Sequence, residues 1–359
     1  MPHKLITTLD LMRHGEPVGG RKYRGQLDDP LSEKGWAQMR RAVGEHCPWQ
    51  AGVPSNKHRT GLFCGFLLSL ACLLISPDAP AEIRVIDDTG RPVILAKPAR
   101  RIVSLAPHVT ELLYAAGAGS RLVGAVEYSD YPDDAKRIPR VGSGFGFDME
   151  AIVAMQPDLI IAWQSGNPSW QVARLSGLGF PVFVTEPRRL DDVAGLLERL
   201  GRLAGTEAVA TKVASEFRHQ RAQLQAHYSG RPPVAVFYQV IDVTLLTVNG
   251  QHLINDVIDL CGGQNVFSDL PSLTPRVDVE SVLQKNPDVI LASGHAPLWP
   301  TWRERWRAWP AFSAAARGNL FFIPPDLIHR HSPRILQGAE QVCAALEKAR
   351  VTLELTTLR

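Results

Sequence analysis

The chain has 359 residues, enough for two domains, and its composition is that of an ordinary soluble globular protein, with 45% hydrophobic and 21% charged residues. The formal net charge of +3 is small for this length, which excludes the electrostatic footprint of a nucleic-acid-binding protein. No run of like charges predicts a disordered tail.

The first motif along the chain is an Arg-His-Gly run that follows a short apolar stretch. Residues 11–43 read LMRHGEPVGGRKYRGQLDDPLSEKGWAQMRRAV and resemble the opening of the histidine phosphatase superfamily, specifically its α-ribazole phosphatases. The resemblance implies that His14 takes the phosphoryl group while Arg13 holds its oxygens. Such chemistry needs a second His and further Arg and Glu residues, but the resemblance stops near residue 50. We therefore expect residues 1–50 to be a truncated, inactive fragment, because so short a segment cannot close a sizeable core.

Residues 57–81 have the order of a secretory signal peptide. A basic flank at 57–59 precedes Gly61–Ser76, a run without charge, and an Ala79-Pro80-Ala81 site follows, after which we expect cleavage. The run is shorter than the about 20 residues that a membrane-spanning helix needs. The prediction is export to the periplasm, with 61–76 tethering the protein to the membrane if cleavage fails. A buried core helix and a lipoprotein anchored through Cys72 are the alternatives.

An internal repeat predicts the architecture of the remaining chain. Residues 148–162 read DMEAIVAMQPDLIIA and residues 278–292 read DVESVLQKNPDVILA, with six of fifteen positions identical. Each copy has an Asp suited to cap a helix, a Glu in the first turn, apolar residues at helical spacing and a Pro-Asp before a buried strand. The repeat predicts two similar α/β lobes. The alternative is that such units simply recur in α/β proteins.

The segment between the two repeats is predicted to be helical. It carries no proline and is rich in helix-forming residues, and two glycines divide it into a helix ending near 203 and a longer one over 206–228. We therefore predict an α/β fold of two Rossmann-like lobes, over 100–203 and 232–350, joined by a single long helix.

Motifs across residues 100–350 carry a second resemblance. They read IVSLAPHVTELLYAAG (102–117), YSDYP (128–132), PDLIIAWQSGN (157–167), CGGQNVF (261–267) and SPR (332–334). They resemble the periplasmic substrate-binding proteins of ABC importers that have a rigid interlobe helix, and among these the cobalamin-binding members. The ferric siderophore and haem binders share the fold and some motifs, so they remain the alternative.

The resemblance implies a non-catalytic receptor without a cofactor or metal, a monomer that captures cobalamin in a cleft between its lobes. A corrinoid is a flat, mostly apolar ring edged with amides, so its cleft needs aromatic faces and a few polar anchors. The residues that match ligand-contacting positions are Tyr128, Trp163, Asp326 and Arg330. Phe145 and Phe147, in a Gly-rich loop, are expected to reach the same cleft. The chain departs from better-known members by having Gly144-Phe145 and Thr274 near two of their tryptophan positions.

The cysteines and two glutamates complete the predictions from this resemblance. Only Cys261 and Cys343 remain after signal cleavage, and the family bridges the matching positions, so we expect a disulfide; two reduced thiols are the alternative. Glu150 and Glu280 occupy equivalent places in the repeat. In the family these positions dock onto arginines of an inner-membrane ABC permease, whereas the alternative role is to stabilise their own helices.

Two histidines invite a metal-binding interpretation. His329 and His331 flank Arg330, but the sequence has no His-rich loop of the kind that zinc-importing receptors use. We expect both to be solvated or hydrogen-bonded rather than metal ligands.

Overall fold

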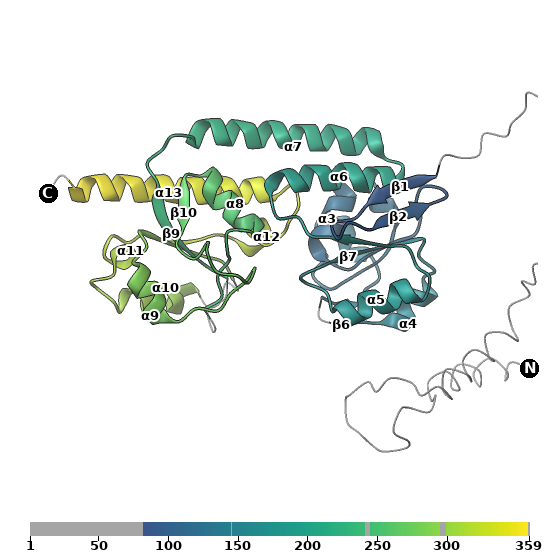
Figure 1. Ribbon diagram of the computed structural model, residues 1–359, viewed down its shortest axis with the longest axis horizontal. Helices are drawn as coiled ribbons and strands as arrows, with labels where there is room; N and C mark the ends of the chain where they lie inside the picture. Colours follow the sequence, from purple (N-terminus) through teal and green to yellow (C-terminus); the bar gives the residue numbers. More distant parts are fainter. Residues whose placement is uncertain (1–81, 145, 241–244, 295–298, 358–359) are drawn as a thin grey trace, which may run out of the picture. The chain divides into compact units, whose positions relative to one another are not determined.

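The computed structural model describes residues 82–144, 146–240, 245–294 and 299–357 (Figure 1). All of them belong to the second of the two compact units of the chain, Ser76–Arg359. The phosphatase-like fragment with Arg13 and His14, the signal peptide and Phe145 lie outside the described residues.

The first lobe is built on a four-stranded parallel sheet with the strand order β4-β3-β7-β8. Its strands are β3 (Ile102–Ser104), β4 (Leu122–Ala125), β7 (Leu159–Trp163) and β8 (Val182–Thr185). They are short apolar runs buried on both faces, as expected for a parallel sheet covered by helices. The α-helices of this lobe are α3 (Pro107–Ala115), α4 (Met149–Ala154), α5 (Ser169–Gly177) and α6 (Leu190–Ala204).

Short elements complete the first lobe. Two antiparallel pairs are present, β1 (Ile83–Ile86) with β2 (Pro92–Leu95) and β5 (Gly142–Ser143) with β6 (Gly146–Phe147). Single 3₁₀ turns are η1 (Gly119–Arg121) and η2 (Asp133–Arg137).

The second lobe repeats the same topology. Its parallel sheet has the order β10-β9-β11-β12, so in both sheets the strands follow the order second, first, third, fourth. The strands are β9 (Val234–Gln239), β10 (Gly263–Asn265), β11 (Val289–Ala292) and β12 (Leu320–Phe322). The helices are α8 (Leu253–Leu260), α9 (Val279–Lys285), α10 (Trp299–Arg307), α11 (Ser313–Ala316), α12 (Pro325–Ile328) and α13 (Ile335–Thr357). The predicted fold class of two similar α/β lobes is confirmed.

The repeat in the sequence forms the same unit in each lobe. Helix α4 leads into β7, and α9 leads into β11. Asp148 Oδ1 accepts a hydrogen bond from the Ala151 N–H at 2.9 Å, and Asp278 Oδ1 accepts one from the Ser281 N–H at 2.7 Å. Each aspartate thus caps its helix in the predicted way. The repeat identifies structurally equivalent positions in the two lobes.

Helix α7 (Glu207–Tyr228) carries the chain from the first sheet to the second (Figure 1). It packs along α6 and contacts α13. Gly205, with φ of +61°, ends α6 in the left-handed conformation that glycine adopts readily, and α7 begins two residues later. Gly201 lets the two helices approach closely, because a Cβ added there would lie 2.3 Å from Ala210 Cβ.

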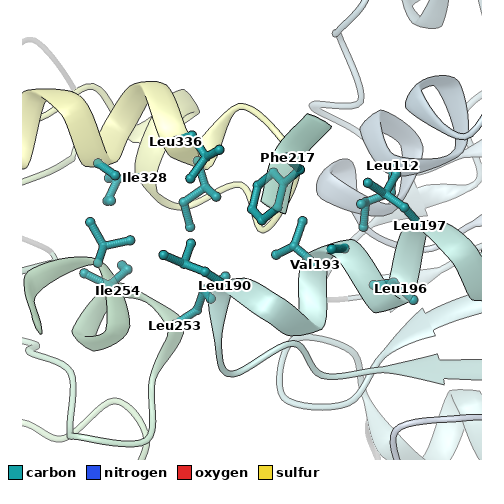
Figure 2. Close-up of a cluster of buried hydrophobic side chains, with 14 of the residues drawn as sticks. Leu112, Leu190, Val193, Leu196, Leu197, Phe217, Leu253, Ile254, Ile328 and Leu336 are labelled. Atoms are coloured by element: carbon teal, nitrogen blue, oxygen red, sulfur yellow. The ribbon is translucent and has the colours of Figure 1, made fainter. Parts of the chain in front are cut away.

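One continuous apolar core extends from the first lobe into the second. Buried leucines and valines recur at helical spacing along α6, so its apolar face needs a packing partner. Figure 2 shows that partner: where α6 begins, Leu190 lies among side chains of α8, α12 and α13. The labelled side chains from the second lobe are Leu253, Ile254, Ile328 and Leu336. The lobes are therefore held together by apolar packing as well as by the chain that links them.

The predicted disulfide is confirmed. Cys261 follows α8 and Cys343 lies in α13, with an S–S distance of 2.01 Å and a sequence separation of 82 residues. The bond fastens these two helices within the second lobe. None of the helices in the described part of the chain combines the length and apolar character that crossing a membrane requires.

Candidate functional site

The YSDYP loop follows β4 and presents Tyr128 to solvent. Tyr128 has φ of +62° and its side chain is 70% exposed. Left-handed backbone is uncommon for an aromatic residue and persists where surrounding contacts impose it. One such contact comes from Arg140, which donates a hydrogen bond of 2.8 Å to the Ser129 carbonyl. The loop thus holds an exposed aromatic ring beyond the carboxyl end of a parallel strand, where ligands of α/β folds bind.

Arg330 joins this loop to the second lobe. Its guanidinium donates a hydrogen bond of 2.8 Å to the Tyr128 carbonyl and lies 3.4 Å from an Asp130 oxygen. It also lies 3.2 Å from Asp326 Oδ1, a carboxylate of the short helix α12. The Arg330 side chain is only 13% exposed, whereas that of Asp326 is mostly exposed. The structure therefore brings three of the predicted contacts, Tyr128, Asp326 and Arg330, to one place between the lobes.

A second polar connection lies beside the first. Ser332 Oγ donates a hydrogen bond of 2.5 Å to Glu111 of α3, and Arg334 donates one of 3.1 Å to the other oxygen of the same carboxylate. Burial raises the pKa of Glu111, while its hydrogen bond from Ser332 and the charge of Arg334 act in the opposite direction. The Arg334 guanidinium also lies 3.9 Å from the centre of the Tyr131 ring. A buried carboxylate of one lobe is thus paired by residues of the other.

Trp163 lies at the carboxyl end of β7, among histidine rings. Its ring centre is 5.0 Å from that of His108 in α3 and 5.7 Å from that of His331, both edge to face. Trp163 is half-buried, and its indole N–H has no hydrogen-bond partner among the described residues. A buried donor without a partner suits a site that a polar ligand group completes.

Phe147 is a correction to the sequence prediction. Its side chain is 7% exposed and packs in the core of the first lobe with Ile152 and Leu175, rather than facing the junction between the lobes. The reason is local: both backbone groups of Phe147 bond to the Gln171 amide of α5, which ties this strand beneath the helix. Phe145 lies outside the described residues.

The structure also locates the remaining predicted residues. Glu150 and Glu280 are exposed in the first turns of α4 and α9, at equivalent places in the two lobes. His329 is hydrogen-bonded, since its Nε2 lies 3.1 Å from the Tyr238 hydroxyl, but His331 is buried, so solvation is wrong for it. Within the described ranges, no group of three or more His, Cys, Asp or Glu side chains is arranged to hold a metal ion.

Sequence reasoning missed Glu111, Asp130 and His108. Their partners lie about 200 residues away along the chain, so no local pattern predicts the pairing. The available indication was the run PHVTEL at 107–112, which places a histidine and a glutamate three residues apart, on one face of a helix.

A separate cavity lies within the first lobe. It has a volume of about 500 Å³ and is lined by the hairpin β1–β2, by α5 and by Trp163. Its buried carboxylate, Asp87, already accepts hydrogen bonds from the backbone of Thr89 and Arg91. The backbone of its own turn thus already satisfies this carboxylate.

Comparison with known proteins defines the class. The model of the family described as periplasmic binding protein matches residues 102–327, and the chain belongs to that family. The match covers the strands of both sheets and α7.

Individual relatives narrow the comparison. The chain is 40% identical over 261 residues to a protein of Vibrio cholerae serotype O1 named vitamin B12-binding protein, covering 72% of this chain and 94% of that one. A solved structure, the periplasmic vitamin B12-binding protein BtuF of Vibrio cholerae, is 39% identical with a TM-score of 0.67, over 70% of this chain and 98% of that one. The periplasmic haem-binding protein RhuT of Roseiflexus has a TM-score of 0.62 at 20% identity, over 70% of this chain and 99% of that one, which shows a shared fold alone.

Proposed function

We propose that this protein is a periplasmic receptor that binds cobalamin, which is vitamin B12, between its two lobes and delivers it to an inner-membrane ABC permease. One observation carries the proposal: the identity of 40% to a vitamin B12-binding protein extends over 94% of that protein. The similarity therefore includes both lobes and the residues that meet between them. The family is one of binding proteins, and the proposed role is capture and delivery without catalysis.

The proposed binding mode follows from the chemistry of the corrin ring. Its flat apolar faces suit the exposed ring of Tyr128 and the half-buried ring of Trp163. Its peripheral amides suit Arg330 as a donor and Asp326 as an acceptor. The Arg330 contacts with Tyr128 and Asp130 then serve the unliganded protein, and a ligand amide exchanges with them. Phe145, in the Gly-rich loop of the first lobe, stays a proposed contact with the ligand.

We further propose that Glu150 and Glu280 dock onto the permease. Both carboxylates are exposed at equivalent places, and paired acidic points fix register and orientation more than affinity. Export by the segment 57–81, action as a monomer and the lack of a resident cofactor belong to the same proposal. The double variant Glu150→Arg with Glu280→Arg should retain cobalamin affinity and lose transport in membranes that carry the cognate permease. Normal uptake would refute docking.

Retention of a ligand by the protein after desalting tests the ligand class directly. The full chain is incubated separately with cyanocobalamin, haem and a ferric siderophore, desalted, and its visible absorption spectrum is recorded. We expect about one cobalamin per chain to be retained, and neither of the iron ligands. Retention of haem or the siderophore by the protein, with cobalamin removed by desalting, would replace the proposed ligand with that competitor.

Phosphate-ester turnover that is lost in His14→Ala would overturn the expectation of an inactive amino-terminal fragment.

A further inference from the structure

Three buried histidines meet where the two lobes join. His108 belongs to α3 of the first lobe, while His252 and His331 belong to the second lobe. The His331 ring centre lies 5.4 Å from that of His108 and 5.5 Å from that of His252. Their exposed fractions are 2% for His108, 8% for His252 and 4% for His331. The rings therefore form a continuous contact across the junction.

The hydrogen bonds of these rings fit their neutral forms. His252 Nδ1 accepts a hydrogen bond of 3.1 Å from the Ile254 N–H and so caps α8, which leaves its proton on Nε2. His108 Nε2 and His331 Nδ1 are buried without a hydrogen-bond partner among the described residues. A proton added at either atom would create a buried cationic N–H that has no acceptor there. The lone pair of His252 is already used, which is consistent with the absence of a metal-binding group in the described ranges.

The charged side chains, other than histidines, that act electrostatically on these rings are arginines. Arg330 lies next to His331 along the chain and acts on His108, and Arg188 acts on His252. Glu111, which follows His108 by three residues in α3, is already bonded to Ser332 and Arg334. His329 acts electrostatically on both rings of the second lobe, and Asp326, which acts on His329, is bonded to Arg330. No carboxylate among these groups is left over to stabilise imidazolium ions.

We infer that His108, His252 and His331 form a pH-sensitive latch between the lobes: neutral rings pack across the junction, and protonated rings repel one another, loosen it and release the bound ligand. We call these three residues the histidine latch. The release of ligand rests on the proposed function, whereas the loosening of the junction does not.

The direction of the pH effect follows from burial. Burial lowers the pKa of His331 to about 4 and places the pKa values of His108 and His252 well below the ordinary value of 6.5. At pH 7.5, about one unit above the ordinary value, the rings are mostly neutral whether the lobes are closed or open. As the pH falls from 6.5 toward 4, the open form gains protons that the closed form excludes, so the closed form loses stability.

Glu111 acts in the opposite direction. Burial raises its pKa, so the closed form takes up a proton on this carboxyl more readily than the open form does. That uptake favours closure as the pH falls. One carboxyl opposes three imidazoles, and its ionic contact with Arg334 limits how far its pKa rises. The net effect of acidification is therefore opening.

Hydrogen exchange of the full chain without ligand measures this opening. Peptides covering α3 and residues 328–336 report on the junction, and a peptide covering β7 reports on the interior of the first lobe. For His331 alone, a pKa of about 4 against 6.5 gives a roughly 30-fold larger opening equilibrium at pH 5.0 than at pH 7.5. After correction for intrinsic exchange rates, we expect at least this change at the junction and less in β7. An equal change in all three peptides, or none, would overturn the latch.

Two sets of variants assign the effect to the histidines. His108→Gln with His331→Gln removes the two rings that each have a buried nitrogen without a hydrogen-bond partner among the described residues. His252→Asn removes the third ring while retaining an acceptor for the α8 cap. Each set should flatten the pH dependence of junction exchange, and because the two sets change different residues, each tests the proposal independently of the other. The matched control is His219→Gln on the exposed side of α7, which should keep the wild-type response. Variants that fold and still show the full 30-fold change would overturn the proposal.

A ligand measurement separates the two proposals. The dissociation constant for cyanocobalamin should rise by tenfold or more between pH 7.5 and 5.0 in the wild type, and by less in the latch variants. Binding with the same pH dependence in all of them would refute ligand release by the latch and leave the proposed function standing. Failure to bind cobalamin at pH 7.5 would refute the proposed function, while the exchange experiment would still decide whether the junction opens.

Discussion

The two lobes share one strand order and one helix-to-strand repeat, yet they bring different chemistry to their junction. At the contact between the YSDYP loop, α3 and residues 330–334, the first lobe supplies acceptors, namely Glu111, Asp130 and the Tyr128 carbonyl. At the same contact the second lobe supplies the donors Arg330, Ser332 and Arg334, whereas at the start of α6 Asp256 of the second lobe accepts from the Leu190 N–H. The shared topology places the carboxyl ends of both sheets in equivalent positions, and residues outside the repeat decide what meets there. Architecture and binding are thus encoded in different parts of each lobe.

The largest expected difference between the lobes concerns covalent stabilisation. Among the described residues, only the second lobe contains a disulfide, which closes a loop with a sequence separation of 82 residues. Because a longer closed loop restricts the unfolded chain more, Cys261→Ala with Cys343→Ala should lower the free energy of unfolding by about 4 kcal/mol. Guanidinium unfolding measures this loss. A loss below about 1 kcal/mol would show that the bond does not stabilise the second lobe.

The next prediction concerns the packing of α6 against α7, the helix that carries the chain from the first lobe to the second. A methyl group at Gly201 of α6 would lie 2.3 Å from Ala210 of α7, so Gly201→Ala should destabilise the protein by about 1–3 kcal/mol. Gly195 in the same helix has no atom within 4 Å of an added Cβ, and Gly195→Ala should stabilise it by about 0.5–1 kcal/mol. Urea unfolding of both variants gives the signs. Equal effects would contradict close packing of α6 on α7.

Aromatic contacts of the first lobe are tested by ligand affinity. Tyr128→Ala and Trp163→Ala should each weaken cobalamin binding by about 1–3 kcal/mol, or roughly 5- to 150-fold, if each ring packs on the corrin. Isothermal titration calorimetry at pH 7.5 measures the change. Trp170→Ala in α5 is the matched control, because that side chain is 56% exposed and belongs to the same lobe. Unchanged affinity in both test variants would contradict the proposed binding mode.

The smallest expected effect tests how equivalent the two repeats are. Asp148→Ala removes the acceptor that caps α4 and should lower stability by about 1 kcal/mol, and Asp278→Ala should act in the same direction on α9. Asparagine retains an acceptor oxygen, so Asp148→Asn and Asp278→Asn should change stability little. Thermal unfolding compares the four variants. If stability falls for only one of the two alanine variants, the two aspartates share a sequence pattern but do not contribute equally to stability.

The sequence predicted those features that depend on local patterns. The N-caps at Asp148 and Asp278, the helix over 206–228 and the two-lobed fold follow from spacing and composition over short segments. The disulfide followed from a family resemblance. Phe147 was assigned to the cleft because its Gly-rich loop was expected to reach there, whereas its bonds to Gln171, 24 residues along the chain, hold it in the core of the first lobe. The pairing of Glu111 with Ser332 joins residues 221 positions apart, which no local pattern encodes.

The central claim is that the ligand binds between the lobes, and hydrogen exchange with and without cyanocobalamin tests it most directly. At pH 7.5, the account predicts that saturating cobalamin slows exchange in residues 126–131 of the first lobe and in residues 328–332 of the second lobe together. Slower exchange confined to the hairpin β1–β2 and α5, which line the separate cavity of the first lobe, would contradict it.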